Sequence, residues 1–337
     1  MITVATIKRE LTVPYTFGAR LRHALDTRGP LCVGIDPHSA LLRAWGLGDD
    51  LAGLDRFAGT VVEALADRVA VLKPQSAFFE RFGSRGIAVL ERTVAQAREA
   101  GALVILDAKR GDIGSTVEAY AQAYLDPASP LFADALTASP YLGFESLDPL
   151  YTAAAKHGAG VFVLAFTSNS EGASVQRAVA ADGASVGAGI LARAAERNAA
   201  ELSGRDATEH AYAVTESAGA DSESWLASAD THYPTTTDIP PTSPFAGTPL
   251  GSLGVVVGAT LDDDLGFDLG RLAGPVLAPG LGAQGAVPAD LARIFGGALG
   301  AVVPSYSREV LRHGPDIGTL RSAATSAVAD CRAALGY

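Results

Sequence analysis

Eight short apolar runs recur along the chain, and they constrain its fold more than any other feature. Each is apolar almost throughout, without the alternation that marks a strand with one face in water, and this is typical of strands buried on both faces of a parallel sheet. The runs occupy residues 31–36, 69–74, 103–107, 135–140, 160–167, 254–260, 276–280 and 301–305. We therefore expect eight buried parallel strands.

Patterns with the spacing of an α-helix lie between most of these runs. The apolar positions are Phe57, Val61 and Leu65 in one pattern, Ile87, Leu90, Val94 and Ala97 in the next, and Leu291, Ile294, Phe295 and Leu299 before the last run. Eight strands that alternate with helices favour a (β/α)8 TIM barrel over an open sheet. We expect one such domain over residues 1–337.

Composition narrows the class of protein further. Of the 337 residues, 48% are hydrophobic and only 19% are charged, which is ample for a large core. The net charge of −11 argues against a nucleic-acid partner. No signal-peptide pattern opens the chain and no apolar run reaches the roughly 18 residues that span a bilayer. We expect a cytoplasmic protein that does not insert into membranes.

The two cysteines, Cys32 and Cys331, lie near opposite ends of the sequence without CxxC spacing. Such an arrangement indicates structural thiols rather than a disulfide framework or a zinc site.

One segment interrupts the alternation between the fifth and sixth expected strands. Residues 203–250 are rich in Ser, Thr, Ala, Pro and Gly, show no sustained apolar period, and contain seven acidic residues and one basic residue. A long polar loop within a compact domain is either functional or disordered, and we interpret this one as a poorly ordered insertion. The three aspartates at 262–264 are interpreted as a solvated turn rather than a metal site.

Polar side chains stand where the apolar runs end. In a (β/α)8 barrel the active site is built at the carboxyl ends of the strands, so these residues are the candidates for chemistry. They are Asp36, Lys73, Asp107, Lys109, Ser139, Thr167, and residues 305–308 after the last run. Asp107 and Lys109 are two apart on a strand, so both side chains are expected to point into the barrel mouth.

The seventh run leads into Pro279-Gly-Leu-Gly-Ala-Gln-Gly285, which satisfies the pattern GxGxxG. A dinucleotide fold would require this pattern in the first βαβ unit with an acid about 20 residues later, and neither condition holds. We interpret the stretch as a loop whose amides and Gln284 close on a phosphate, with Arg308 as a bidentate partner. The alternative is a plain tight turn and a surface arginine.

Asp112 and Thr116 lie beyond the third run, four residues apart in a Gly-rich stretch that enters a helix. This spacing would put both on one helical face, where they could face a neighbouring subunit. For Asp112 the alternative is a helix N-cap.

In combination these residues resemble the orotidine 5′-phosphate decarboxylase family, particularly its longer bacterial branch. The resemblance is carried by Lys73, by Asp107-Ala-Lys109-Arg-Gly-Asp112-Ile-Gly-Ser-Thr116, by 137–141, by Thr167-Ser168-Asn169, by 279–285 and by Arg308. It covers nearly the whole chain except the first dozen residues and the insertion.

The resemblance implies a homodimer that converts orotidine 5′-monophosphate to uridine 5′-monophosphate (UMP) and CO2 without metal or organic cofactor. It implies that Lys109 protonates C6 and that Lys73, Asp107, Lys109 and Asp112 form an alternating charge chain, with Asp112 and Thr116 supplied by the partner subunit. It further places Asp36, Lys73, Asp112 and Thr116 at the ribose, Ser139 at the pyrimidine, and Gly280, Gln284 and Arg308 at the phosphate.

A related barrel lyase acting on a sugar phosphate, such as a hexulose-phosphate synthase, is the nearest alternative, because such enzymes share the pattern DxKxxD. They hold an enediolate with Mg²⁺, and a lysine at position 73 disfavours a metal site there. A nucleotide-binding barrel without catalytic activity is the remaining alternative.

Overall fold

The structure is a computed structural model that describes residues 16–204, 243–261, 265–282 and 284–337. Its strands form a closed parallel barrel in which each strand pairs with the next and β8 returns to β1. The strands are β1 (Cys32–Ile35), β2 (Val71–Pro74), β3 (Leu103–Arg110), β4 (Ala135–Ala138), β5 (Gly160–Phe166), β6 (Leu253–Val257), β7 (Val276–Pro279) and β8 (Val302–Tyr306). The expected (β/α)8 barrel is confirmed, and every strand overlaps one of the eight apolar runs.

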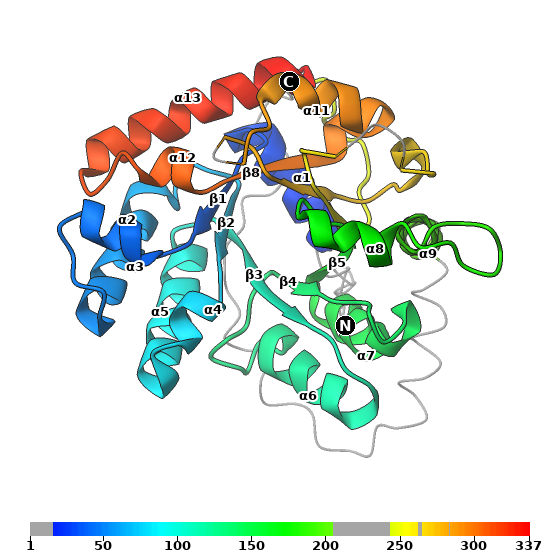
Figure 1. The fold of residues 1–337 in the computed structure, drawn as a ribbon, viewed down its shortest axis with the longest axis horizontal. Helices are drawn as coiled ribbons and strands as arrows, with labels where there is room; N and C mark the ends of the chain where they lie inside the picture. The colour runs from blue at the N-terminus through cyan, green and yellow to red at the C-terminus, as the bar shows by residue number, and fades with distance from the viewer. Residues whose placement is uncertain (1–15, 205–242, 262–264, 283) are drawn as a thin grey trace, which may run out of the picture.

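Helices surround this barrel (Figure 1). The α-helices are α1 (Phe17–Arg28), α2 (Ser39–Ala44), α3 (Leu51–Leu65), α4 (Ala77–Glu80), α5 (Gly83–Glu99), α6 (Gly114–Leu125), α7 (Asp148–His157), α8 (Ala173–Gln176), α9 (Val186–Leu202), α11 (Pro288–Phe295), α12 (Arg308–Leu311) and α13 (Ile317–Leu335). Short 3-10 helices are η1 (Phe144–Leu147), η2 (Ser170–Gly172), η3 (Leu269–Arg271) and η4 (Gly296–Ala301).

The helical patterns of the sequence are confirmed in α3 and α5, but the third is only partly right. The α-helix α11 ends at Phe295, and Leu299 belongs to the 3-10 helix η4. Gly296, with φ +25° and ψ −97°, ends the α-helix. Because Gly297 follows directly, two residues with weak helix propensity interrupt the pattern.

Two apolar cores hold the barrel together. Outward-facing strand residues pack against the surrounding helices, whereas inward-facing residues fill the barrel interior with α1. Leu103 and Ile105 point inward and Val104 and Leu106 outward, as strand alternation requires. The same alternation directs Asp107, the next inward position, toward the barrel axis.

The helix α1 closes the end of the barrel where the strands begin. Phe17, Leu21 and Leu25 are fully buried in the interior core, and Phe17 meets Phe162 of β5 edge to face at 5.9 Å. Asp134, just before β4, is fully buried and binds Arg20 of α1 at 2.5 Å and Arg98 of α5 at 3.2 Å. This end of the barrel is therefore sealed, and the opposite end is left for the site.

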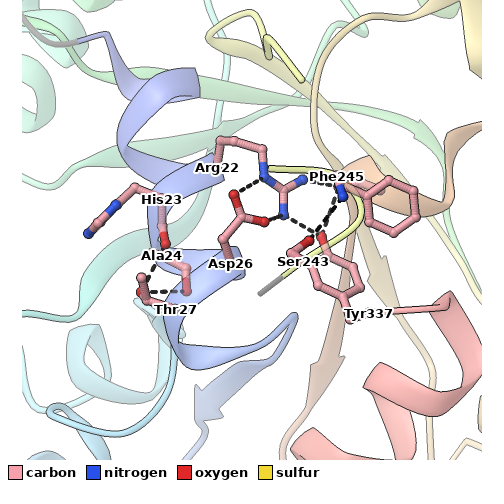
Figure 2. A network of polar contacts seen from close by, with 9 residues as sticks. Arg22, His23, Ala24, Asp26, Thr27, Ser243, Phe245 and Tyr337 are labelled. Atoms are coloured by element: carbon pink, nitrogen blue, oxygen red, sulfur yellow. Dashed lines mark hydrogen bonds and ion pairs between the residues drawn. The ribbon is translucent and has the colours of Figure 1, made fainter. Parts of the chain in front are cut away.

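Part of the expected insertion belongs to this sealed end. In Figure 2, Arg22 of α1 lies beside Asp26, Tyr337, Ser243 and Phe245. The guanidinium of Arg22 donates to Asp26 Oδ2 at 3.0 Å and to the Tyr337 hydroxyl at 2.7 Å, and the Phe245 ring packs on the Tyr337 ring at 5.0 Å.

The expectation of poor order over 203–250 was therefore wrong for its last residues. Ser243 and Leu250 are buried, because this stretch covers the sealed end of the barrel. Residues 205–242 lie outside the described residues, as do the aspartates at 262–264.

Candidate active site

The carboxyl ends of the strands bring most of the candidate residues to one mouth of the barrel. Asp36 directly follows β1, Lys73 lies in β2, and Asp107 and Lys109 lie in β3. Ser139 follows β4, Gly280 follows β7, and Arg308 begins α12 just after β8. All strands of the closed barrel are parallel, so these ends converge.

Asp107 is the centre of a charged array between two lysines. Lys73 Nζ lies 2.9 Å from Asp107 Oδ2, and Lys109 Nζ lies 2.6 Å from Asp107 Oδ1. The side chains of Lys73 and Asp107 are 9% and 10% exposed, whereas that of Lys109 is 44% exposed. The array therefore runs from the buried Lys73 to an ammonium that reaches into the mouth.

The array keeps the Asp107 carboxylate and the Lys73 ammonium charged. Burial opposes ionisation of Asp107, but Lys73 and Lys109 outweigh burial and hold the pKa of its carboxyl well below the usual value. Burial likewise opposes the charge of Lys73, but the carboxylates of Asp107 and Asp36 raise its pKa above the usual value. At neutral pH the array is an alternating set of full charges.

A β-bulge shapes β3 at this point. Leu106 pairs with Leu136 and Arg110 with Ala138, so three residues of β3 oppose the single residue Thr137 of β4. Lys109 has φ +49°, in the left-handed region that residues other than glycine seldom adopt. Asp107 and Lys109 do meet as expected, but through a bulge with strained backbone rather than along a regular strand.

The loop after β7 contacts the loop after β5. Gly280 has φ +111°, a conformation that favours glycine, and the carboxamide oxygen of Gln284 accepts a hydrogen bond of 3.0 Å from the Ser168 hydroxyl. Among the described residues, the amide nitrogen of Gln284 donates no hydrogen bond, so it is available to a ligand. Arg308 is exposed, and its side chain forms no hydrogen bond or ion pair with the part of the chain that the structure describes.

Two buried oxygen atoms at the mouth lack partners. Asp36 Oδ1 and Ser307 Oγ are buried and receive or donate no hydrogen bond among the described residues. Both side chains lie against Gly34: a Cβ there would be 2.9 Å from Asp36 Oδ2 and 3.1 Å from Ser307 Cβ. Buried polar atoms without partners are costly, so these two atoms are suited to a polar ligand.

The structure does not bring Asp112 and Thr116 into the array of their own chain. Asp112 precedes α6, so the two do not share a helical face as the spacing suggested, and Thr116 is exposed in the first turn. Ile113, not Asp112, is the N-cap of α6, and among the described residues Asp112 Oδ1 accepts only from the adjacent Ile113 N–H, at 2.9 Å. The capping alternative is therefore not supported.

Comparison with known proteins identifies the family that shares this arrangement. The model of the orotidine 5′-phosphate decarboxylase / HUMPS family matches residues 29–323, which include all eight strands and the charged array. The chain belongs to the orotidine 5′-phosphate decarboxylase / HUMPS family.

Relatives within the orotidine 5′-phosphate decarboxylase / HUMPS family are close in sequence and in length. The chain is 57% identical to the orotidine 5′-phosphate decarboxylase of Streptomyces coelicolor over 95% of this chain and 98% of the relative. It is 55% identical to that of Salinispora tropica, with the same coverage. A crystal structure of a Streptomyces avermitilis protein assigned the same name is 54% identical, with a TM-score of 0.79 and 96% of both chains covered.

Two residues of this family member's mouth escaped the sequence analysis as candidates for the array. Gln75 Nε2 lies 3.3 Å from Asp107 Oδ2, and the Thr137 hydroxyl donates to Asp107 Oδ1 at 2.9 Å. Asp107 thus accepts from two ammonium groups, an amide and a hydroxyl. The signal for Gln75 was its position two residues after Lys73 at a strand end, and the signal for Thr137 was its place inside the fourth apolar run.

The sequence analysis also left the contacts of Ser139 and Ser168 undefined. The sequence assigned Ser139 a role because it ends the fourth run, and the structure shows its backbone N–H donating to Arg110 O at 2.8 Å. Ser168 was part of the quoted resemblance but received no role, although its hydroxyl contacts Gln284. Among the described residues, no group of three or more His, Cys, Asp or Glu side chains could hold a metal ion.

Proposed function

We propose that this chain decarboxylates orotidine 5′-monophosphate to UMP and CO2, the last step of UMP biosynthesis. The observation that carries the proposal is the alternating array of Lys73, Asp107 and Lys109 at the barrel mouth. The family match and the names of the relatives support the same activity.

The chemistry explains why such an array is useful. Loss of CO2 from C6 of the pyrimidine leaves a carbanion with no adjacent π-system to accept its charge, so the protein must stabilise it electrostatically. In our proposal the Lys109 ammonium faces this carbanion and donates its proton to C6, while Asp107 lies beside the departing carboxylate. Two unit charges about 4 Å apart interact by roughly 4 kcal/mol at an effective dielectric near 20, so the array can hold Lys109 charged and in place.

The remaining candidates bind the rest of the substrate. Asp36 and Lys73, with the partner's copies of residues 112 and 116, would bind the ribose hydroxyls, and the unpartnered Asp36 Oδ1 supports this role. Gly280, Gln284 and Arg308 would bind the phosphate, and Ser139 the pyrimidine edge. Phosphate binding far from C6 can favour closure of the site and so lower the barrier as well as KM.

A homodimer is the second part of the proposal, with Asp112 and Thr116 reaching the neighbouring site. Ile113, Tyr141 and Leu142 are 61%, 78% and 53% exposed. The bond from Ser139 N to Arg110 O holds the loops that carry them side by side. Exposed apolar side chains, next to a carboxylate that forms no ion pair among the described residues, are typical of a surface that another subunit covers.

We also propose that the enzyme is cytoplasmic and needs no cofactor. Both cysteines are buried and free, as expected in a reducing compartment. Among the described residues no helix is long and apolar enough to cross a membrane.

A single assay separates this proposal from the metal-dependent alternative. Purified protein is mixed with orotidine 5′-monophosphate in EDTA, and loss of the orotate absorbance is followed. Turnover that resists the chelator supports the proposal, whereas turnover of a sugar phosphate that requires added Mg²⁺ would favour the related lyase. Tight binding of orotidine 5′-monophosphate without turnover would favour a binding protein.

A further inference from the structure

We infer that Thr137 is a positioning residue for the proton donor, and that its hydroxyl holds Lys109 in the conformation that protonation requires. The inference rests on the proposed function. Thr137 lies in β4 and is 1% exposed. Its hydroxyl bonds Lys109 and Asp107, so its role would be exerted through these two residues.

The Thr137 hydroxyl closes a ring of hydrogen bonds that begins and ends on Lys109. The backbone N–H of Lys109 donates to Thr137 Oγ1 at 2.9 Å, and the same hydroxyl donates to Asp107 Oδ1 at 2.9 Å. Asp107 Oδ1 in turn accepts from Lys109 Nζ at 2.6 Å. The backbone and the ammonium of the same lysine are thus tied to one buried threonine and one carboxylate.

The chemistry of the groups fixes the direction of each bond in this ring. A backbone N–H can only donate and an ionised carboxylate can only accept. The single hydroxyl hydrogen must therefore point to Asp107, and a lone pair must face Lys109. A side chain at position 137 needs both a donor and an acceptor on one atom, which a methyl group cannot provide.

The bulge in β3 explains why a side-chain hydroxyl is needed at position 137 to bind the Lys109 backbone. Three residues of β3 face Thr137 alone, so the regular ladder between β3 and β4 is interrupted there. The Thr137 hydroxyl supplies the acceptor for the Lys109 N–H, which would otherwise be left without one inside the barrel wall. It does so at the residue whose φ of +49° is strained.

Arg110, the residue after Lys109, is also fixed by its own partners. The Thr137 hydroxyl is therefore the group that determines the conformation of Lys109. Arg110 forms an ion pair with Glu80, and its Nε donates to the Tyr124 hydroxyl at 3.1 Å. With Asp107 and Arg110 both fixed by their own partners, loss of the Thr137 hydroxyl would release only the backbone between them. We expect the backbone of Lys109 to relax from the left-handed region and its ammonium to move away from the position that proton transfer requires.

The test compares two variants of Thr137 with a matched control. Thr137→Val keeps the shape and removes the hydroxyl, whereas Thr137→Ser keeps the hydroxyl and removes the methyl. Thr93→Val is the control, because Thr93 is also a buried threonine, 3% exposed, but its hydroxyl bonds Val89 O within α5. Wild type and variants are assayed for kcat, KM and UMP affinity, and the structure of Thr137→Val is determined by crystallography.

We expect Thr137→Val to lose about 100-fold in kcat, since a misplacement of about 1 Å can cost that much. KM and UMP affinity should stay within about threefold, because the substrate contacts are unchanged. Thr137→Ser and Thr93→Val should keep kcat within about threefold of wild type. In the crystal structure Lys109 of Thr137→Val should have left the left-handed region. Thr137→Ala replaces the valine variant if the latter does not fold.

Three outcomes would overturn the inference. They are a kcat of Thr137→Val close to wild type, a serine variant as impaired as the valine variant, or a Lys109 that keeps its φ and its bond to Asp107 without the hydroxyl. Failure of wild type itself to decarboxylate the substrate would contradict the proposed function instead. Even then the crystal structure of Thr137→Val would still decide whether the hydroxyl positions Lys109.

Discussion

At the scale of single residues, Asp107 decides how the mouth behaves. Its two oxygens accept from Lys73, Lys109, Gln75 and Thr137, which leaves little capacity for any further donor. An acceptor so fully used cannot move without breaking several bonds. In the proposed mechanism Lys109 is therefore held in position before the substrate arrives, and such preorganisation is what electrostatic stabilisation requires.

Replacement of Lys109 by alanine should abolish turnover and leave binding intact. The change removes the proton donor and a positive charge that matters most when C6 becomes anionic, so kcat should fall by several orders of magnitude, whereas UMP affinity should change little. Stopped-flow or steady-state absorbance with a parallel UMP titration measures both. Activity within about tenfold of wild type would contradict the assignment. A purely structural lysine would instead cost stability while preserving activity per folded molecule.

Asp107 should also make stability depend on pH. Its folded pKa is depressed, so its contribution is present above the unfolded pKa of about 3.9 and is lost as pH falls below that value. Asp107→Asn cannot ionise and leaves two lysines without their carboxylate, which should cost about 3 to 5 kcal/mol near neutral pH. Urea unfolding of both proteins should show this difference shrinking as the pH falls below about 4. A difference that does not change with pH would show that the ion pairs contribute nothing.

At the scale of elements, the strands and their order could be predicted because each is an apolar run, and most of these runs end at a polar residue. The candidate residues at the mouth followed from those ends. The bulge in β3 could not be predicted, because register depends on which residues of two strands face each other, and Asp107-Ala-Lys109 reads as a regular strand. Gln75 and Thr137 were missed for the same reason, since their partners are defined only once β2, β3 and β4 are aligned.

The loop after β7 and the start of α12 should act on the phosphate. Arg308→Ala and Gln284→Ala should weaken handling of orotidine 5′-monophosphate, with the larger loss for Arg308 because a charge-assisted bond is about twice as strong as a neutral one. Decarboxylation of orotidine without the phosphate, which is slow already, should hardly change in either variant. Kinetics with both substrates provide the check, and equal losses for the two substrates would refute a role in phosphate binding.

Two deletions should distinguish residues 205–242 of the expected insertion from its packed end. Removal of 205–242 with a short Gly/Ser linker should leave a folded, active enzyme, because the sequence there has no apolar period with which to join the core. Extending the deletion through 248 also removes Ser243 and the Phe245 ring that packs on Tyr337, and loss of this aromatic pair should cost about 0.5 to 1.5 kcal/mol more. Thermal and urea unfolding compare the two, and collapse of the shorter deletion would show that the insertion belongs to the fold.

At the scale of the whole molecule, we propose that Asp112 acts across two subunits. It forms no ion pair within the described part of its own chain, and apolar side chains around it are exposed. Mixed dimers of Asp112→Ala and Lys109→Ala subunits would contain one site with both changes and one with neither.

Exchange of subunits between these two inactive variants should therefore restore activity. Random exchange at equal concentrations makes half of the dimers mixed, each with one intact site, so about a quarter of wild-type activity should return if the sites are independent. Native mass spectrometry confirms that mixed dimers are present. No recovery in their presence would exclude a shared site and return Asp112 to its own chain.

The helix α1, which closes one end of the barrel, limits how substrate and products enter and leave. Phe17, Leu21 and Leu25 fill the barrel at the end where the strands begin, so the interior offers no route through the fold. We expect substrate, CO2 and UMP to enter and leave through the same barrel mouth. UMP, the larger product, then has to dissociate before the next substrate can bind. UMP should accordingly compete directly with orotidine 5′-monophosphate for this mouth. A cell that accumulates UMP would then slow UMP synthesis by product inhibition, without any separate regulatory site.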